Sequence, residues 1–599
     1  MSAPSPLTVS GSLCSFAITS QGKEIDGAIQ VFSIETWNQM GKIPKARLVI
    51  FDGSPSDQTF AVSSTPTFVP GAKIVISAGY DNTNKPIFSG VVTAQSLQID
   101  TKNASKLVVD IVDEALKMTL ERTNAFFEKT TDSDLIGKLI TANGLAKDVG
   151  NTALVHEEIV QFYASDWDLM LMRAEMNGFV AWADGGKVTV KAPDTSTSAV
   201  LTVGFGDAIY ELDAEMNAAT QFASSAIKSS AWDSATQKLV TAGPGTVNVE
   251  EAGNLSSADL AKVFAVKTYP QVTGAPLEKD SLQQWSSGEL LKSKLAKIRG
   301  RVSFQGSALA QLGKMITLAG LGTRFNGDVY VSGVQHCISE GRWTTTAIFG
   351  LSPTWFAADT PNIAAPATSG QMPAARGLQT GVVKKVAPDP GGEYRVFVSL
   401  PLLGDDAKGV WARLASFYAS NKFGAEFYPE VGDEVVVAFM NEDPRYPVIL
   451  GSVYSKKLPP PLPPDEKNSK KTLTTRSKLE ITFDDESKII TIATPGKNTI
   501  VLDDKAKSIT ISDMNKNSAT FSSSGVAIDS ASHVTLTAKG NITLDAKGNV
   551  ALKAAANATL EGLQITHTAK TKFSAQGTAQ AELKSSAMVV VQGAIVKIN

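Results

Sequence analysis

The sequence has few of the residues that build reactive or metal-binding sites. Its 599 residues include only two cysteines, Cys14 and Cys337, which lie more than 300 positions apart. Two distant thiols make neither a disulfide framework nor a thiolate metal cluster, and they fit synthesis in a reducing compartment. The four histidines are scattered at positions 156, 336, 533 and 567. We expect structural thiols, no catalytic residues, no cofactor and no metal site.

Long apolar runs and an excess of basic residues are also missing. One of the longest apolar runs, Val435 to Met440, has the length of a buried strand and not of a membrane-spanning helix. Residues Met1 to Ser12 lack the basic start and the continuous apolar stretch of a secretory signal. The 56 Lys and Arg do not exceed the 59 Asp and Glu, as they would in a nucleic-acid binder. We expect synthesis in a reducing compartment without a signal peptide, and no nucleic-acid partner.

Motifs of common enzyme classes do not occur. A zinc protease helix needs His-Glu-x-x-His, but the segment that begins at His156 ends in Val160. Neither a Gly-x-Ser-x-Gly elbow nor a phosphate-binding Gly-rich loop is present. His567 could present three imidazoles to the axis of a trimer, yet such a residue more often lies at the surface. Glu434 and Asp443 lie in a region of strands and turns, where solvated carboxylates are the simpler interpretation than a glycosidase pair. We therefore predict a protein that is not an enzyme.

Residues 472–599 have a composition that cannot build a globular core. They contain no Trp or Tyr and are rich in Ala, Thr, Ser, Lys and Asn. They repeat instead with a period of eight: Val534-Thr-Leu-Thr-Ala-Lys-Gly-Asn, then Ile542-Thr-Leu-Asp-Ala-Lys-Gly-Asn, then Val550-Ala-Leu-Lys-Ala-Ala-Ala-Asn, then Ala558-Thr-Leu-Glu-Gly. A longer repeat precedes the octads, because Phe483-Asp-Asp leads to Ile490-Thr-Ile and Leu502-Asp-Asp leads to Ile509-Thr-Ile.

Each octad predicts one short strand and one sharp corner. Apolar and polar residues alternate as in a half-buried strand, and Lys-Gly-Asn tolerates a positive φ. Eight residues extend at most about 27 Å, which is too short for one chain to wrap a filled coil, so we expect three chains to supply the walls. The predicted trimer core of the needle consists of Val534, Leu536, Ile542, Leu544, Val550 and Leu552. A disordered tail and a single-chain β-solenoid remain as alternatives.

The preceding residues predict two further domains and two linkers. Residues 1–355 mix strands with helices, which we expect from Asp132 or Ser133 to Gly144, from Ser165 to Gly178, and from Asp280 to Gly300. Residues 356–375 are rich in Pro, Ala, Ser and Thr and predict a linker. Five short strands within 376–457 suit a small OB-type barrel. The prolines of 458–471 predict a semi-rigid spacer before residues 472–599.

Several segments carry a resemblance to a known family. In the barrel they are Gly381-Val-Val, Tyr394-Arg-Val-Phe-Val, Val410-Trp-Ala-Arg, Pro429-Glu-Val-Gly-Asp-Glu-Val and Asp443-Pro-Arg-Tyr-Pro-Val. Before the barrel they are 161–178 and 326–336, and at the end 591–599. In this order they resemble the VgrG-type spike proteins of type VI secretion systems, of extracellular contractile injection systems and of phage-tail-like hubs. The resemblance covers nearly the whole chain.

The resemblance implies a fold that is mainly β with some α: an α+β hub, an OB-fold barrel and a C-terminal trimeric β-helix or β-prism needle. It implies a homotrimeric spike that caps the inner tube, contacts baseplate components and punctures the target envelope without inserting stably into the membrane. A PAAR-repeat tip protein would dock on Ile595, Val596, Lys597, Ile598 and Asn599, and effector cargo is a further possible partner. The chain would leave the cytoplasm within the injection particle. A trimeric receptor-binding fibre or adhesin, and a peptidoglycan-cleaving hub, are the alternatives.

Overall fold

The chain forms two compact units, Met1–Val453 and Tyr454–Asn599. The computed structural model describes residues 3–8, 13–102, 104–404 and 408–598. Strands take up 38% of the chain and helices 13%, which confirms the expected class of mainly β with some α. Among the described residues, no helix combines the length and the hydropathy that crossing a membrane requires.

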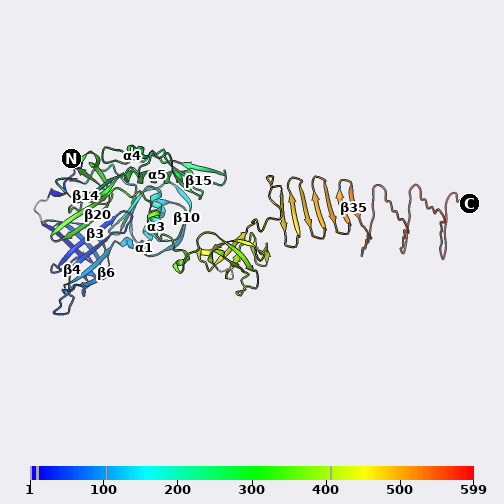
Figure 1. Cartoon of the computed structure of the whole chain (residues 1–599), viewed down its shortest axis with the longest axis horizontal. Coiled ribbons are helices and arrows are strands. Elements are labelled where there is room, and N and C mark those ends of the chain that lie inside the picture. Colours follow the sequence, from blue (N-terminus) through cyan, green and yellow to red (C-terminus); the bar gives the residue numbers. More distant parts are fainter. Residues whose placement is uncertain (1–2, 9–12, 103, 405–407, 599) are drawn as a thin grey trace. The chain divides into compact units, whose positions relative to one another are not determined.

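A 13-stranded sheet forms the centre of the N-terminal unit (Figure 1). Alternation explains its strands, because in β4 the side chains of Ala46, Leu48 and Ile50 are buried while Lys45 and Arg47 are exposed. The hydrogen-bonded order is β14 (Ile209–Met216), β18 (Ile298–Gln305), β21 (Arg342–Phe349), β20 (Gly327–Ser339), β3 (Val31–Gln39), β4 (Lys45–Phe51), β7 (Ser105–Val112), β6 (Thr83–Ile99), β5 (Lys73–Tyr80), β1 (Cys14–Ser20) and β2 (Lys23–Glu24). β19 (Met315–Ala319) pairs with β20 and with β13 (Leu201–Gly204).

Smaller sheets and the helices complete this part of the chain. The sheets are β10 (Val155–Ala164) with β8 (Thr123–Thr131); β11 (Val180–Asp184), β12 (Lys187–Lys191) and β9 (Ala146–Val149); and β16 (Lys238–Ala242), β15 (Ile227–Asp233) and β17 (Tyr269–Thr273). The α-helices are α1 (Lys117–Leu120), α2 (Asp132–Ala142), α3 (Asp166–Met176), α4 (Ser257–Phe264), α5 (Lys279–Leu295), α6 (Gly322–Phe325) and α7 (Phe356–Asp359). Short 3-10 turns lie at Pro6–Thr8, Pro66–Phe68, Glu114–Leu116, Ala367–Gly370, Pro401–Leu403 and Met440–Glu442.

The three predicted helices are present, with three corrected boundaries. One is the start of α5, which begins at Lys279 after the N-cap Glu278 and not at the predicted Asp280. The N-cap of α2 is Thr131, whose hydroxyl accepts a hydrogen bond from the Asp134 amide, so the cap lies one residue before the predicted start. α3 is capped by Ser165 as expected. The predicted end of the third helix at Gly300 is wrong, because α5 stops at Leu295 and Ile298 begins β18, where it pairs with Met216.

A closed five-stranded barrel follows the large sheet, as predicted. Its order is β22 (Gln379–Lys385), β23 (Val396–Ser399), β24 (Val410–Leu414), β28 (Pro447–Ser452) and β27 (Glu434–Phe439). A two-stranded ribbon, β25 (Ala419–Ser420) with β26 (Phe423–Gly424), lies between β24 and β27 in the chain. The barrel is small because its interior is filled by short β-branched side chains, of which Val383, Val398, Val435 and Val437 are fully buried. Met440, the last residue of the predicted strand Val435 to Met440, falls outside β27 and is exposed.

The C-terminal unit begins with a seven-stranded antiparallel meander (Figure 1). Its strands are β29 (Lys470–Thr474), β30 (Glu480–Asp484), β31 (Ile489–Ala493), β32 (Thr499–Asp503), β33 (Ser508–Ser512), β34 (Ser518–Ser522) and β35 (Gly525–Asp529). Each strand pairs with the next one in the chain, so all its contacts are local. Residues 530–598 contain no strand within one chain.

Candidate assembly surface

The meander has one apolar face, because large apolar residues occupy the same side of successive strands. The register places them in two rows that cross the sheet from strand to strand. One row is Leu473, Ile481, Ile492, Ile500, Ile511, Ala519 and Ile528; the other is Phe483, Ile490, Leu502, Ile509, Phe521 and Val526. Directly opposed apolar side chains stabilise the pairing of strands, and they also make the face continuous.

The other face of the meander is mostly polar. Its central row contains Thr472, Thr482, Thr491, Thr510 and Thr520 in cross-strand register, with Val501 between Thr491 and Thr510. The Thr482 hydroxyl donates to the Thr472 hydroxyl over 3.3 Å. Hydroxyl groups remain well hydrated at a surface, so this face needs no cover, whereas the apolar face does.

No residue that the structure describes buries the apolar face. No described residue of the C-terminal unit is buried, and the last buried apolar side chain along the chain is Ile449 of the barrel. Ile500 is 38% exposed and Phe521 is 47% exposed. A sheet of this size with one open apolar face is the signature of an interaction surface.

The residues predicted as the trimer core are also exposed in a single chain. Val534, Leu536, Ile542, Leu544, Val550 and Leu552 are all more than half exposed. They lie in residues 530–598, where the structure brings no other part of the chain against them as a strand. The single-chain β-solenoid is therefore not formed, and the predicted trimer core stays a prediction.

The predicted corners of the octads are present. The backbone bends at Lys539-Gly540, at Lys547-Gly548 and at Ala555-Ala556, in each case in the sixth and seventh positions of the octad. Regular bends are not a property of a disordered tail. The sequence thus predicted the corners correctly. The predicted strands between them are not paired within one chain.

The predicted docking segment for a tip protein is exposed at the chain end. Ile595 and Ile598 present most of their side-chain surface to solvent, and Val596 about half. Lys597 is exposed as well. Asn599, which we included in this segment, lies outside the described residues. Docking there stays a prediction.

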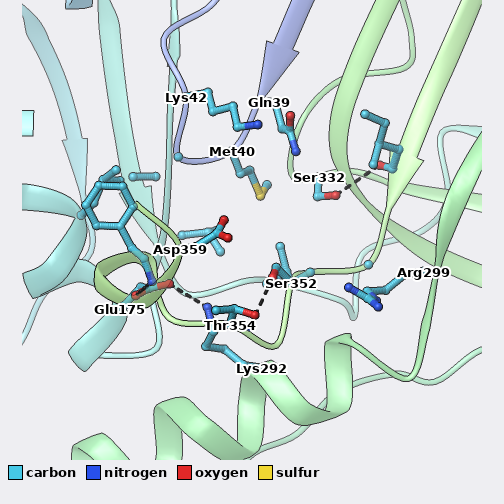
Figure 2. Close-up of a pocket in the computed structure, with 18 of the residues that line it drawn as sticks. Gln39, Met40, Lys42, Glu175, Lys292, Arg299, Ser332, Ser352, Thr354 and Asp359 are labelled. Atoms are coloured by element: carbon cyan, nitrogen blue, oxygen red, sulfur yellow. Dashed lines mark hydrogen bonds and ion pairs between the residues drawn. The ribbon is translucent and has the colours of Figure 1, made fainter. Parts of the chain in front are cut away.

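A cavity of about 870 Å³ lies in the N-terminal unit. Figure 2 shows Gln39 and Met40 on one side of it and Lys292 and Thr354 on the opposite side. Lys292 is paired with Glu175 over 2.7 Å, and the second oxygen of Glu175 accepts from the Phe356 amide. These two charges stabilise each other, so neither Lys292 nor Glu175 is an activated nucleophile or a free general base.

A buried polar cluster surrounds Asp132, which is completely buried. Arg173 donates to both carboxylate oxygens, at 2.6 and 3.0 Å, and the Asn177 amide donates at 2.7 Å. The ring of His156 lies 3.1 Å from the same carboxylate. Burial alone would raise the pKa of Asp132, but the Arg173 charge and these hydrogen bonds bring it below its usual value.

This cluster holds elements of the N-terminal unit together. It ties α2, α3 and β10 to one another, because His156 belongs to β10 and not to a helix. The missing second histidine of the zinc protease motif agrees with this placement. Within the described ranges, no three His, Cys, Asp or Glu side chains are grouped as metal ligands.

Comparison with known proteins supports the resemblance to VgrG-type spikes. The family model of the type VI secretion system/phage-baseplate injector OB domain matches residues 379–454, which is the five-stranded barrel. The type VI secretion system spike protein VgrG4b of Pseudomonas aeruginosa is 43% identical over 58 residues, 10% of this chain and 7% of that protein. The actin cross-linking toxin VgrG1 of Vibrio cholerae is 30% identical over 89 residues, 14% of this chain and 8% of that protein. This chain thus spans less than a tenth of either relative.

A solved structure from Escherichia coli aligns with much of this chain. The c3393 protein, described as a component of the type VI secretion system with structural similarity to bacteriophage T4 tail proteins gp27 and gp5, aligns with 73% of this chain and 99% of its own, at 12% identity and a TM-score of 0.35. The OB-domain model and the sequence matches to VgrG proteins confirm the resemblance to a VgrG-type spike with an OB domain. The model of the Alg8 N-terminal domain matches residues 10–340, more than half of the sequence, and the chain therefore belongs to the Alg8 N-terminal domain family.

Proposed function

We propose that the chain is the homotrimeric spike and hub of a contractile injection machine. The observation that carries this proposal is the C-terminal unit, which has an extended apolar face and no buried residue of its own. An isolated sheet of this kind is not stable in water without a cover. Three copies that bring their apolar faces together cover one another and leave three polar faces outside.

The energetics favour association over an open sheet. Covering a half-exposed Ile or Leu contributes about 1 kcal/mol, and each chain offers more than ten such side chains in two rows. That sum exceeds the several kcal/mol that association costs in lost freedom. The octads add further layers of the same kind, with Val534, Leu536 and their successors toward the shared axis.

The resemblance and the OB-domain match support the following roles for the domains. Residues 1–355 form the hub on the inner tube, 376–457 join hub to shaft, and 472–599 form the spike, with 356–375 and 458–471 as linkers. Residues 595–599 seat a PAAR-type tip protein, and effectors travel as cargo. The protein is made in the bacterial cytoplasm, assembles with baseplate components, and crosses the target envelope without staying in the membrane.

A structural role, and not catalysis, agrees with the paired charges of the cavity and with the buried Asp132 cluster. The toxin name of one relative belongs to a protein of which the matched segment is 8%. A peptidoglycan-cleaving hub predicts loss of turbidity when purified protein is added to cell walls. An unchanged suspension supports the structural role.

Native mass spectrometry tests the assembly. One chain has a mass of 63.2 kDa, so the trimer has a mass of about 190 kDa. Removal of 472–599 leaves the hub and barrel and weakens the assembly. A full-length chain that stays monomeric at micromolar concentration contradicts the proposal.

A further inference from the structure

The octad repeat extends past the units that are evident in the sequence, and it changes phase once. The backbone bends begin at residues 539, 547, 555, 563, 570, 578, 586 and 594. The spacing is eight residues at every step except the one from 563 to 570, which is seven. A repeat with one residue deleted therefore continues to the end of the described chain.

Alignment on these bends assigns each residue a position in its unit. The short unit is Ala558-Thr-Leu-Glu-Gly-Leu-Gln, and the next is Ile565-Thr-His-Thr-Ala-Lys-Thr-Lys. The latter matches Val534-Thr-Leu-Thr-Ala-Lys-Gly-Asn, with His567 in the place of Leu536. Our sequence interpretation ended the octads at Gly562, missed the phase change, and so favoured a surface role for His567.

The third position of the unit, like the first, is apolar in this region except in the unit that contains His567. It is occupied by Leu536, Leu544, Leu552 and Leu560, and after the phase change by His567, Ala575, Leu583 and Val591. Because side chains alternate along an extended segment, residues in one position of successive units share one side. A histidine in this column replaces a leucine on the side that we assign to the shaft axis.

A contact within the chain supports this placement. The rings of His567 and Phe573 stack, with centroids 5.9 Å apart and planes inclined by 29°. The two residues flank the bend at 570–571, and Phe573 opens the following unit, in the position of Val534. His567 thus lies against Phe573, an apolar residue in the first position of the next unit.

We propose that three His567 side chains, one from each chain, form a binding site for one divalent transition-metal ion on the shaft axis. This site rests on the trimer of the proposed function, because one chain supplies only one imidazole. Three-fold symmetry brings three equivalent nitrogen donors together, and neutral imidazole is a ligand for zinc, nickel and cobalt. A fourth position on the axis remains for water or a small anion.

The neighbouring layers explain why an ion is the preferred occupant. Leu560 on one side and Phe573 on the other make the site apolar, where an unsatisfied imidazole nitrogen costs free energy. Binding a metal satisfies all three rings at once. A leucine at this position would fill the layer without any ligand, as it does in four preceding units.

Zinc binding to the metal-stripped, full-length protein tests the site. The wild-type trimer should gain one zinc ion per three chains in native mass spectra, and zinc should raise its unfolding temperature. His567→Leu restores the octad pattern, so this variant should remain a trimer and lose the ion. His533→Gln changes a histidine in the eighth position, outside the apolar column, and should keep it.

Each outcome decides the question. Zinc retained by the His567→Leu trimer, or absent from the wild-type trimer, overturns the metal site while the spike remains. A wild-type chain that is monomeric before zinc is added overturns the trimer, and with it this site. The mass measured without metal distinguishes the two failures.

Discussion

Ile500 of β32 lies directly opposite Ile511 of β33, on the apolar face of the meander, which the described part of the chain leaves exposed. Thr510, the neighbour of Ile511, lies in the row of the opposite face. Adjacent residues of one strand thus point into two different environments, one apolar and one polar. The pair provides a direct test of which face joins the copies.

Ile511→Lys should dissociate the trimer, because it places three charges in a surface that must become dry. The expected result is a loss of the species of about 190 kDa in native mass spectra at micromolar concentration. Thr510→Lys introduces the same side chain on the polar face and should leave the trimer intact. Equal effects of the two substitutions would contradict the assigned interface.

Much of the fold could be predicted because helix caps and turns are made by residues that are neighbours in the sequence. Pairing between distant strands leaves no such local pattern. Ser165 and Asn177 mark both ends of α3 in the sequence, because a cap is made by neighbours in the chain. The end of α5 was missed, since Ile298 leaves the helix only to pair with Met216, more than 80 positions earlier. No short-range pattern records such a partner.

The apolar surface of the C-terminal unit could likewise be predicted only in part from the sequence. The octads gave a visible period and therefore the predicted core at Val534 and Leu536. The apolar rows of the meander were not assigned to the core, although Ile490-Thr-Ile and Ile509-Thr-Ile show the alternation that could have identified them. These two motifs lie on one face because of the register in which their strands pair, and this register is known only from the structure.

Arg173→Leu should destabilise the N-terminal unit strongly. Asp132 is fully buried, and Arg173 is the group that donates to both its oxygens. Breaking a buried pair by removing one partner costs about 3–5 kcal/mol, because the remaining charge is uncompensated. Chemical denaturation followed by tryptophan fluorescence measures this loss, since no Trp lies beyond Trp411.

The exposed pair of Lys262 and Asp259 on α4 provides the control for that measurement. Lys262→Leu should change the stability little, as is usual for ion pairs exposed to water. Adding Asp132→Asn to Arg173→Leu should recover part of the stability by removing the unpaired charge. A single Arg173→Leu variant as stable as the wild type would show that the cluster is not structural.

Acid should weaken the N-terminal unit through His336. This ring is buried in β20, where it accepts a hydrogen bond from Trp343 Nε1, and burial lowers its pKa to about 4. Its ordinary pKa is about 6.5, so between these values the unfolded chain binds more protons than the folded one. The stability contributed by neutral His336 is complete above pH 6.5 and falls as the pH approaches 4, by about 3 kcal/mol in total.

His336→Gln should remove this part of the pH dependence. Denaturant unfolding at pH 7.5 and at pH 4.5, measured on both proteins, separates it from the titration of other groups. The wild type should lose more stability than the variant over this interval. Parallel losses would mean that His336 is accessible to protons in the folded state.

Lys507→Gly should stabilise the turn between β32 and β33. Lys507 has a φ of 50°, in the left-handed region, where a residue with a Cβ is strained by about 1 kcal/mol and glycine is not. Hydrogen exchange followed by mass spectrometry of peptides from 499–512 should slow by a factor of about two to five. Lys505→Gly lies in the same turn without a positive φ, so it relieves no strain and should leave exchange unchanged or faster. Slower exchange in Lys505→Gly than in Lys507→Gly would show that charge removal, and not backbone strain, controls the stability of this turn.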